Sequence, residues 1–283
     1  MPVYKNNKTD KILYGIFDFN KSSAPLGDFL GLLEELLIIL IKKKYSRIEI
    51  CFIGNSFGLL HAKELKSLNK EWLYISGFNS SLKSWIGQLS ISLLKFDSYY
   101  VFPNNQTLSK FLKINRANND TWPTQEKLKT EEKNYGYSTL AKKQFKEKGS
   151  IPYLEFKADI IKSALDFIDN YITPHRLVTV HLKNSTRVSG KADWYNADFD
   201  AWIPFFKKSL SSFDVKFLLI GDETIPEEIH KLPNVLTSQT FSNSLTLDLA
   251  LIQASYAFMG SASGPSTIAK YSATPYLIYK NPN

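Results

Sequence analysis

A loop of small residues near the carboxyl end of the chain has the composition of an anion-binding site. It lies within Tyr256 to Lys280, YAFMGSASGPSTIAKYSATPYLIYK, which is typical of a short strand, a loop, a short helix and a second strand. Gly260 and Gly264 lack the Cβ that would hold a ligand away from the backbone, and glycine tolerates positive φ. This loop therefore has room to close on a phosphate or a diphosphate.

The helix after this loop begins with residues that suit a helix start. Ser263 is a good N-cap, and Pro265 fits the first turn because that turn does not use a proline N–H. The free amides of Ser266, Thr267 and Ile268 would point at a ligand in the loop, with the positive end of the helix dipole behind them. An ordinary strand–turn–helix connection would use the same residue types, so both interpretations stay open.

A second candidate site is the loop KSSAPLGD, residues 21–28, between a predicted strand and an apolar helix. Ligands of open α/β sheets bind beyond the carboxyl ends of the strands, where this loop falls. Gly27 would let an acceptor substrate approach, with Ser22 and Ser23 beside it. Asp28 would start the helix, where its carboxylate could act as a general base. The structural alternative is a plain N-cap, since Asp often precedes an apolar run.

A third constellation is VHLKN, residues 180–184, at the end of a predicted strand in the second half. His181 and Lys183 alternate with a leucine, so both side chains project from the same face. Lys183 could offset the charge of a diphosphate leaving group. His181 is more often a hydrogen-bonded structural residue than an acid–base group. The polar loop that follows adds Lys191 and suits a phosphate contact, although such loops are commonly only solvated.

A weaker signal is Gly221-Asp222, which follows the apolar run VKFLLI and precedes Glu223. An acidic pair in this place can bind ribose hydroxyls or a base, but it more often caps a turn. The sequence contains no HExxH, no Cys/His metal spacing and no GxSxG. We therefore expect no metal and no cofactor.

The order of apolar runs predicts two α/β halves. Strands alternate with helices in both parts of the chain, which is typical of parallel, doubly wound sheets. The predicted domains are residues 1–173 and 174–283, joined near Pro174. Residues 104–149 are polar and lysine-rich, and we expect a surface excursion or a loop that orders over a ligand. An apolar helix over about 28–44 should lie on a sheet, with Glu34 and Glu35 towards solvent.

Composition limits the classes of function. The chain of 283 residues is 43% hydrophobic, so it can bury large cores. Its net charge of +8, mostly lysine, suits an anionic ligand or peripheral contact with an anionic membrane. Arginine is scarce and no nucleic-acid-binding motif is present, so nucleic acid is not an expected partner. The lone Cys51 and the absence of a signal peptide fit a reducing cytoplasm, with membrane attachment at most at the inner face.

Two stretches resemble a known family. The segment KSSAPLGDFLGLLEEL resembles the amino-terminal motif of the ADP-heptose:lipopolysaccharide heptosyltransferase family, and LTLDLALIQASYAFMGSASGPSTIAKYSATPYLIY is similar to its carboxyl-terminal motif. FLLIGDE and residues 191–194 fall between them in the right order. The strand VTVHLKN also resembles the His-x-Arg strand of fucosyltransferases, with lysine in place of arginine. The resemblance does not cover residues 104–171.

The resemblance implies a fold and an activity. The family has a GT-B fold, with two Rossmann-like domains facing a cleft, and transfers a sugar from a nucleotide sugar with inversion and without metal. Carried over, Asp28 is the base, and Lys191 or Lys183 contacts the donor phosphates, with His181, Gly221 and Asp222 nearby. The residues implied for the diphosphate site are Ser261, Ser263, Gly264, Pro265, Ser266 and Thr267. Ser-Ala-Ser-Gly replaces the family's usual Asp-Thr-Gly, which leaves the donor sugar open.

These observations together predict a glycosyltransferase of surface-polysaccharide or lipopolysaccharide biosynthesis. Its partners would be a nucleotide-sugar donor and a glycan or lipid-linked acceptor. Two alternatives stay open: a non-catalytic nucleotide-sugar-binding module, and a GT-B nucleotide-sugar epimerase. The chain ends directly after a predicted strand, without the helix that usually packs back on the first domain. Either the sequence is incomplete or the protein lacks that helix.

Overall fold

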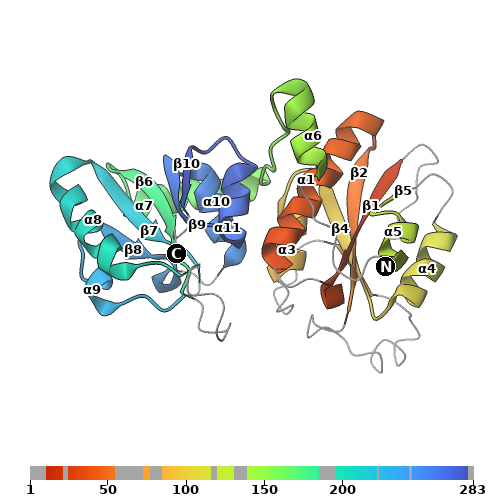
Figure 1. Ribbon diagram of the computed structural model, residues 1–283, viewed down its shortest axis with the longest axis horizontal. Coiled ribbons are helices and arrows are strands. Elements are labelled where there is room, and N and C mark those ends of the chain that lie inside the picture. The colour runs from red at the N-terminus through yellow and green to blue at the C-terminus, as the bar shows by residue number, and fades with distance from the viewer. Residues whose placement is uncertain are drawn as a thin grey trace. The chain divides into compact units, whose positions relative to one another are not determined.

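The computed structural model describes residues 11–21, 25–54, 73–76, 85–115, 120–130, 139–184, 196–221, 223–241 and 244–279. Contacts divide the chain into two compact units, Met1–Leu154 and Glu155–Asn283, each of mixed α/β structure (Figure 1). Helix α7 (Ala158–Tyr171) belongs to the second unit, where it packs on α10 (Leu245–Ala254) and its Phe167 and Tyr171 rings contact Phe241. The division therefore falls before α7, whereas the sequence predicted it after this helix, near Pro174.

The first unit is built on a five-stranded sheet with the order β3-β4-β2-β1-β5. Its strands are β1 (Ile12–Asp18), β2 (Arg47–Ile53), β3 (Leu73–Ser76), β4 (Phe96–Phe102) and β5 (Asp120–Trp122). Four strands are parallel, whereas β3 pairs with β4 in the antiparallel direction. An antiparallel edge strand on an otherwise parallel sheet is common. The doubly wound α/β fold is confirmed, with this one difference.

The helices of the first unit cover both faces of its sheet. They are α1 (Pro25–Lys43), α3 (Trp85–Ser92), α4 (Asn105–Ile114), α5 (Gln125–Thr130) and α6 (Thr139–Lys148), with a short 3-10 turn at Phe19–Lys21. Side chains of β1 alternate between the faces. Phe17 packs on Phe29 of α1, whereas Tyr14 packs on Phe111 of α4. A Cβ at Gly15 would lie 2.3 Å from Leu36, so glycine lets α1 approach the sheet closely.

The prediction of a polar excursion over residues 104–149 was wrong. Helix α4 buries Leu108, Phe111 and Leu112 in the core, and β5 pairs with β1 as an edge strand. The i, i+3, i+4 spacing of these three buried residues was the signal that could have identified α4, whereas the three residues of β5 are too few to show a period. The described parts of this segment therefore belong to the sheet and its cover.

The prediction that Glu34 and Glu35 face solvent was also wrong, because both are fully buried. Helix α1 contacts α3 and α6 as well as the sheet, so it is covered on more than one side. Glu35 accepts hydrogen bonds from Trp122 Nε1 (2.9 Å) and from the backbone N–H of Leu140 (3.1 Å). Both carboxylate oxygens of Glu34 lack a hydrogen-bond partner within the described part of the chain.

The second unit is a fully parallel sheet with the order β10-β9-β6-β7-β8. Its strands are β6 (Arg176–His181), β7 (Val215–Leu219), β8 (Val235–Thr237), β9 (Ala257–Ser261) and β10 (Tyr276–Tyr279). Helices α8 (Phe199–Ser212) and α9 (Glu227–His230) pack against one face through Trp202, Phe206 and Ile229. On the other face Thr179 contacts Ser255 at the end of α10, and α10 packs on α11 (Gly264–Lys270).

The described helices differ from membrane-spanning segments. None of them is both long enough and apolar enough to cross a bilayer.

Candidate functional site

The second sheet reverses its strand order between β6 and β9. From β6 the chain proceeds outward to β7 and β8, and then returns to place β9 on the opposite side of β6. Open α/β sheets bind ligands beyond the carboxyl ends of the strands at such a point. His181 ends β6 and is the register partner of Gly260 in β9. The structure therefore brings two of the sequence-predicted sites, VHLKN and the small-residue loop, to one place.

His181 contacts an acidic side chain at this point. Its Nε2 lies 3.1 Å from Glu223 Oε1, and both side chains are shielded from solvent. Burial acts to raise the pKa of Glu223, but the hydrogen bond and charge of His181, together with the charge of Lys183, outweigh it and lower this pKa. Gly221, with φ of 105°, permits the contact, because a Cβ there would lie 2.4 Å from Glu223 Oε2.

A second buried carboxylate belongs to the same cluster. Asp248, in the first turn of α10, accepts hydrogen bonds from the Gly221 N–H (3.0 Å) and from Ser238 Oγ (3.2 Å). Burial raises the pKa of Asp248 to about 6, against the effect of these two bonds. The sequence analysis overlooked this residue because an acidic residue in the first turn of a helix is common. Its position within the apolar run LTLDLALI was the signal that could have identified it.

Several polar atoms around β6 and β9 are buried without a hydrogen bond. Within the described residues, these atoms have no partner: His181 Nδ1, Glu223 Oε2, Asp248 Oδ1, Ser261 Oγ and Ser263 Oγ. Buried polar atoms in native proteins are usually satisfied, and an unsatisfied one costs about 1–3 kcal/mol. Five such atoms at the switch point of a sheet are a set of donors and acceptors suited to a polar ligand.

The small-residue loop starts its helix as the sequence predicts. Ser263 precedes α11, and its N–H donates to Ser266 Oγ at 3.0 Å. The hydroxyls of Ser266 and Thr267 both donate to the Ser263 carbonyl, at 2.7 Å and 3.3 Å. These two hydroxyls are thus used within the first turn of α11. Pro265 is buried in the same turn. Binding of a diphosphate by this loop stays a prediction.

Gly260 lies against the backbone of β6. A Cβ at this residue would be 2.5 Å from the carbonyl oxygen of His181 and 3.2 Å from its nitrogen. Since both atoms are backbone, neither can move without distorting β6.

We therefore expect Gly260→Ala to lower the free energy of unfolding by about 1–3 kcal/mol, the usual cost of overpacking. Urea denaturation measures this change. Gly149→Ala is the control, because a Cβ there meets nothing within 4 Å and only its positive φ of 70° opposes the change. Equal losses in the two variants would contradict the steric argument.

The remaining donor-side candidates are only partly described. Lys183 lies just beyond β6 and is partly buried, and its backbone oxygen accepts from the Ala197 N–H (2.7 Å). Asn184 Nδ2 donates to the carbonyl of Thr224 (3.0 Å), which ties the segment after β6 to the segment after β7. Lys191 and Asp222 lie outside the described residues.

In the first unit, Asp28 is placed differently from the prediction. Helix α1 begins at Pro25, so Asp28 lies in its first turn and is not the N-cap. Gly27 and Asp28 are partly exposed. The sheet order also reverses here, between β1 and β5, and α1 follows the carboxyl end of β1. Lys21 Nζ donates to the Leu128 carbonyl beyond β5, whereas Ser22 and Ser23 lie outside the described residues.

Comparison with solved structures identifies the fold. A glycosyl transferase family 9 structure from Veillonella parvula is similar over 95% of this chain and 80% of its own length, with a TM-score of 0.52 and 10% sequence identity. The chain has the fold of a family 9 glycosyltransferase.

Two other solved structures match at lower TM-scores. The E. coli heptosyltransferase WaaC with ADP-2-deoxy-2-fluoro heptose matches over 94% of this chain and 88% of its own, at 12% identity and a TM-score of 0.49. POFUT1 in complex with GDP matches over 95% and 98%, at 11% identity and a TM-score of 0.44. No family model and no curated protein matches the sequence. The similarity to the family 9 structure confirms the resemblance seen in the sequence at the level of the fold.

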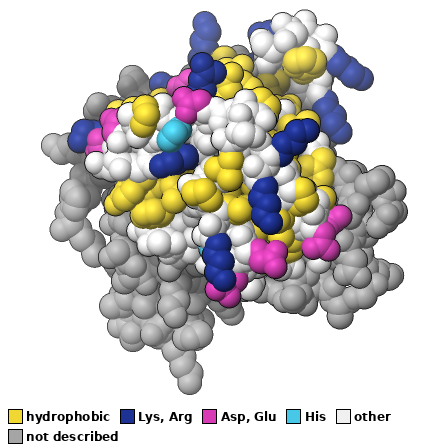
Figure 2. Space-filling model, turned by 90° about the vertical axis from the view of Figure 1, so that its left-hand side faces the viewer, with side chains coloured by type: hydrophobic (Ala, Val, Ile, Leu, Met, Phe, Trp, Pro, Cys, Tyr) yellow, Lys and Arg dark blue, Asp and Glu magenta, His cyan; other side chains and the backbone are white. Residues whose placement is uncertain are grey.

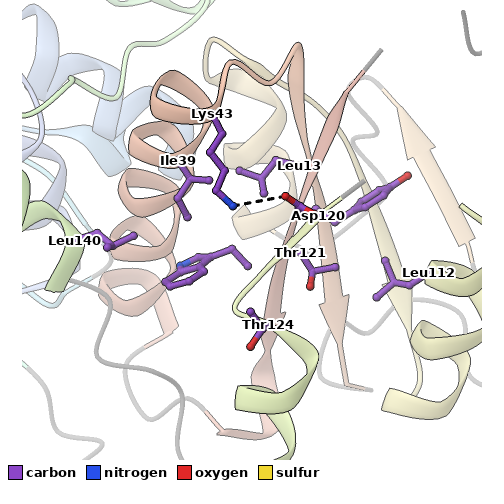
Figure 3. Close-up of a pocket in the computed structure, with 10 residues that line it drawn as sticks. Leu13, Ile39, Lys43, Leu112, Asp120, Thr121, Thr124 and Leu140 are labelled. Carbon is purple, nitrogen blue, oxygen red and sulfur yellow. Dashed lines mark ion pairs between the residues drawn. The ribbon is translucent and has the colours of Figure 1, made fainter. Parts of the chain in front are cut away.

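A separate hollow of about 480 Å³ lies at the β5 edge of the first sheet (Figure 3). Leu13, Ile39, Leu140 and Trp122 form apolar walls, and Lys43 pairs with Asp120 at 3.6 Å. Tyr45 also donates a hydrogen bond to Asp120. Residues of β1 and β5 both line it, but none of the sequence-predicted site residues that the structure describes does.

A metal site is not apparent in the parts of the chain that the structure describes. No three His, Cys, Asp or Glu side chains of those residues come together in a way that could hold an ion. Transfer without a metal stays a prediction.

Proposed function

We propose that this protein is a glycosyltransferase that moves a sugar from a nucleotide-sugar donor to a glycan or glycolipid acceptor in surface polysaccharide or lipopolysaccharide biosynthesis. The observation that carries the proposal is the buried polar cluster at the β6–β9 switch point, in a chain with a glycosyltransferase fold. Ligands of such sheets bind at this place. The five unpartnered atoms supply hydrogen-bond donors and acceptors for a polar guest such as a nucleotide sugar.

The donor would lie on the second unit. Its diphosphate would accept hydrogen bonds from the backbone amides at the start of α11, where the helix dipole is positive. Ser261, Ser263 and Gly264 would surround it. Lys183, and Lys191 in the loop beyond, would offset the charge of the departing nucleotide diphosphate in place of a metal. His181 and Glu223, with the backbone of Gly221 and Asp248 behind them, would accept and donate hydrogen bonds to the nucleoside.

The first unit would supply the base and hold the acceptor. In this mechanism Asp28 takes the proton of the acceptor hydroxyl while that oxygen attacks the anomeric carbon. The bond from that carbon to the nucleotide diphosphate breaks as the new bond forms, so the anomeric configuration inverts. Ser22, Ser23 and Gly27, in the segment before Asp28, would contact the acceptor.

A thermal-shift screen with UDP, GDP, ADP, CMP and their sugars tests the donor site. We expect one nucleotide series to raise the melting temperature, because a ligand at about 100 times its Kd stabilises the folded state by ~2.7 kcal/mol. His181→Ala should reduce this shift, since it removes one side of the buried pair. Lys207→Ala, an exposed position of α8, is the control and should keep it. A screen in which no nucleotide shifts the melting temperature would overturn the proposal.

One observation favours a non-catalytic binding module as a second candidate. The loop before α11 reads Ser-Ala-Ser-Gly, and the hydroxyls of Ser266 and Thr267 are used within the helix start. Calorimetry would separate the two candidates, together with product analysis in the presence and absence of acceptors. Nucleotide binding without turnover on any acceptor would favour the module, whereas an altered sugar released without an acceptor would indicate an epimerase.

A further inference from the structure

The positive charge of this protein is concentrated in one of its two units. Residues 1–154 contain 23 Lys and Arg against 14 Asp and Glu, so their net charge is +9. Residues 155–283 contain 12 against 13, for a net charge of −1. Figure 2 shows a face of the second unit on which basic, acidic and hydrophobic side chains are interspersed. The excess of basic residues therefore belongs to the first unit.

Much of this excess lies on the carboxyl-terminal end of α1 and on α6. We call this surface the α1–α6 face, and it consists of the exposed residues Ile41, Lys42, Lys43, Lys44, Lys142, Lys143, Phe145, Lys146, Glu147 and Lys148. The two helices contact each other, and Glu147 joins them through ion pairs with Lys42 and Lys143, each at 3.8 Å. Seven lysines thus share this surface with Glu147, and the exposed carboxylate of Asp120 pairs with Lys43 beside it at 3.6 Å.

Two large apolar side chains are exposed among these lysines. Phe145 of α6 is 59% exposed and Ile41 of α1 is 54% exposed. On α6, Ala141 and Gln144 are buried against the protein, whereas Lys142, Phe145 and Lys146 are exposed. The apolar hollow at the β5 edge borders the same region, since Lys43 of α1 and Leu140 of α6 both line it (Figure 3).

We propose that the α1–α6 face binds the surface of an anionic phospholipid bilayer. Lysines near such a surface are attracted to its negative potential, and each contributes to binding. Phe145 and Ile41 would lie at the boundary between headgroups and acyl chains, where burial of apolar surface is favourable. A nucleic acid has no apolar phase in which Phe145 and Ile41 could be buried. All seven basic residues are lysine, which cannot form the bidentate hydrogen bonds that arginine forms with phosphates.

Sedimentation with lipid vesicles tests this inference and needs no turnover, so it is independent of the proposed reaction. We expect binding to phosphatidylcholine vesicles in which roughly one third of the lipid is phosphatidylglycerol, and little binding to phosphatidylcholine alone. The triple variant Lys142→Gln, Lys143→Gln, Lys146→Gln should lower the partition coefficient about a hundredfold, at roughly fivefold per lysine. Phe145→Ser should lower it about tenfold, and this loss should persist at high salt because it is apolar.

The matched control is Lys207→Gln, Lys208→Gln, Lys231→Gln on the second unit, three exposed lysines that give the same change in net charge. This control should bind anionic vesicles as the unchanged protein does, and circular dichroism should show that all variants are folded. Equal losses in the two triple variants would mean that only net charge matters, which would overturn the inference. Equal binding to neutral vesicles would overturn it too, as would RNA binding by the unchanged protein with no vesicle binding.

Discussion

Asp28→Asn is expected to lower the rate of sugar transfer about a hundredfold or more while leaving donor affinity unchanged. General acid–base groups commonly contribute a factor of about 10²–10⁴ in rate. Asparagine has nearly the size and shape of aspartate but cannot accept the proton of an acceptor hydroxyl. Asp28 lies in the first turn of α1, beyond the carboxyl end of β1, and it is partly exposed, so a substrate can reach it.

The measurement is the release of nucleotide diphosphate with the donor and acceptor that the thermal-shift and product assays identify. The control is Asp97→Asn, an exposed aspartate of β4 that is paired with Arg47 at 3.8 Å. Both variants should bind the donor with unchanged affinity, because neither lies in the second unit. If Asp28→Asn is folded and turns over at a near-normal rate, Asp28 is not the base. The proposed donor site would be unaffected by that result if the thermal-shift screen shows nucleotide binding.

The strands and helices that the sequence predicted well are those with strong local signals. Helix α7 has a clear helical period, and strand β10 is an isolated run of apolar residues. The signal failed where elements were short or where pairing decides the structure. Three residues of β5 carry no period of their own, and only pairing with β1 makes them a strand. The antiparallel direction of β3 likewise depends on its partner, β4.

In the candidate site, too, the sequence predicted the local features but not the contacts between distant residues. The sequence identified the ends of β6 and β9 as candidate sites, because glycine, serine, histidine and lysine at the end of a strand are typical of ligand-binding loops. It could not show that the reversal of strand order brings them together, nor that Glu223 pairs with His181. Asp248 enters the cluster only through the packing of α10 beside Gly221. Contacts between residues far apart in the chain therefore could not be predicted from the sequence.

Glu34 is the clearest case of tertiary structure overriding a local pattern, and it carries a large expected effect on stability. Burial, reinforced by the charge of Glu35, raises the pKa of Glu34 from 4.5 to about 8. In the folded state the group keeps its proton at pH values where the unfolded chain has lost it. Stability must then fall as pH rises from about 5 to about 8, because the unfolded state releases the proton first. A shift of this size corresponds to a loss of up to ~5 kcal/mol.

Glu34→Gln should remove this pH dependence, since glutamine is neutral at every pH and has nearly the same volume. The difference in unfolding free energy between Glu34→Gln and the unchanged protein should therefore grow by several kcal/mol between pH 5 and pH 9, in favour of the variant. Urea denaturation at the two pH values gives this difference directly, and titrations of groups far from Glu34 cancel in the subtraction. Glu155→Gln, an exposed position, should show no such growth. A constant difference for Glu34→Gln would mean that the carboxylate reaches water or a cation when it ionises.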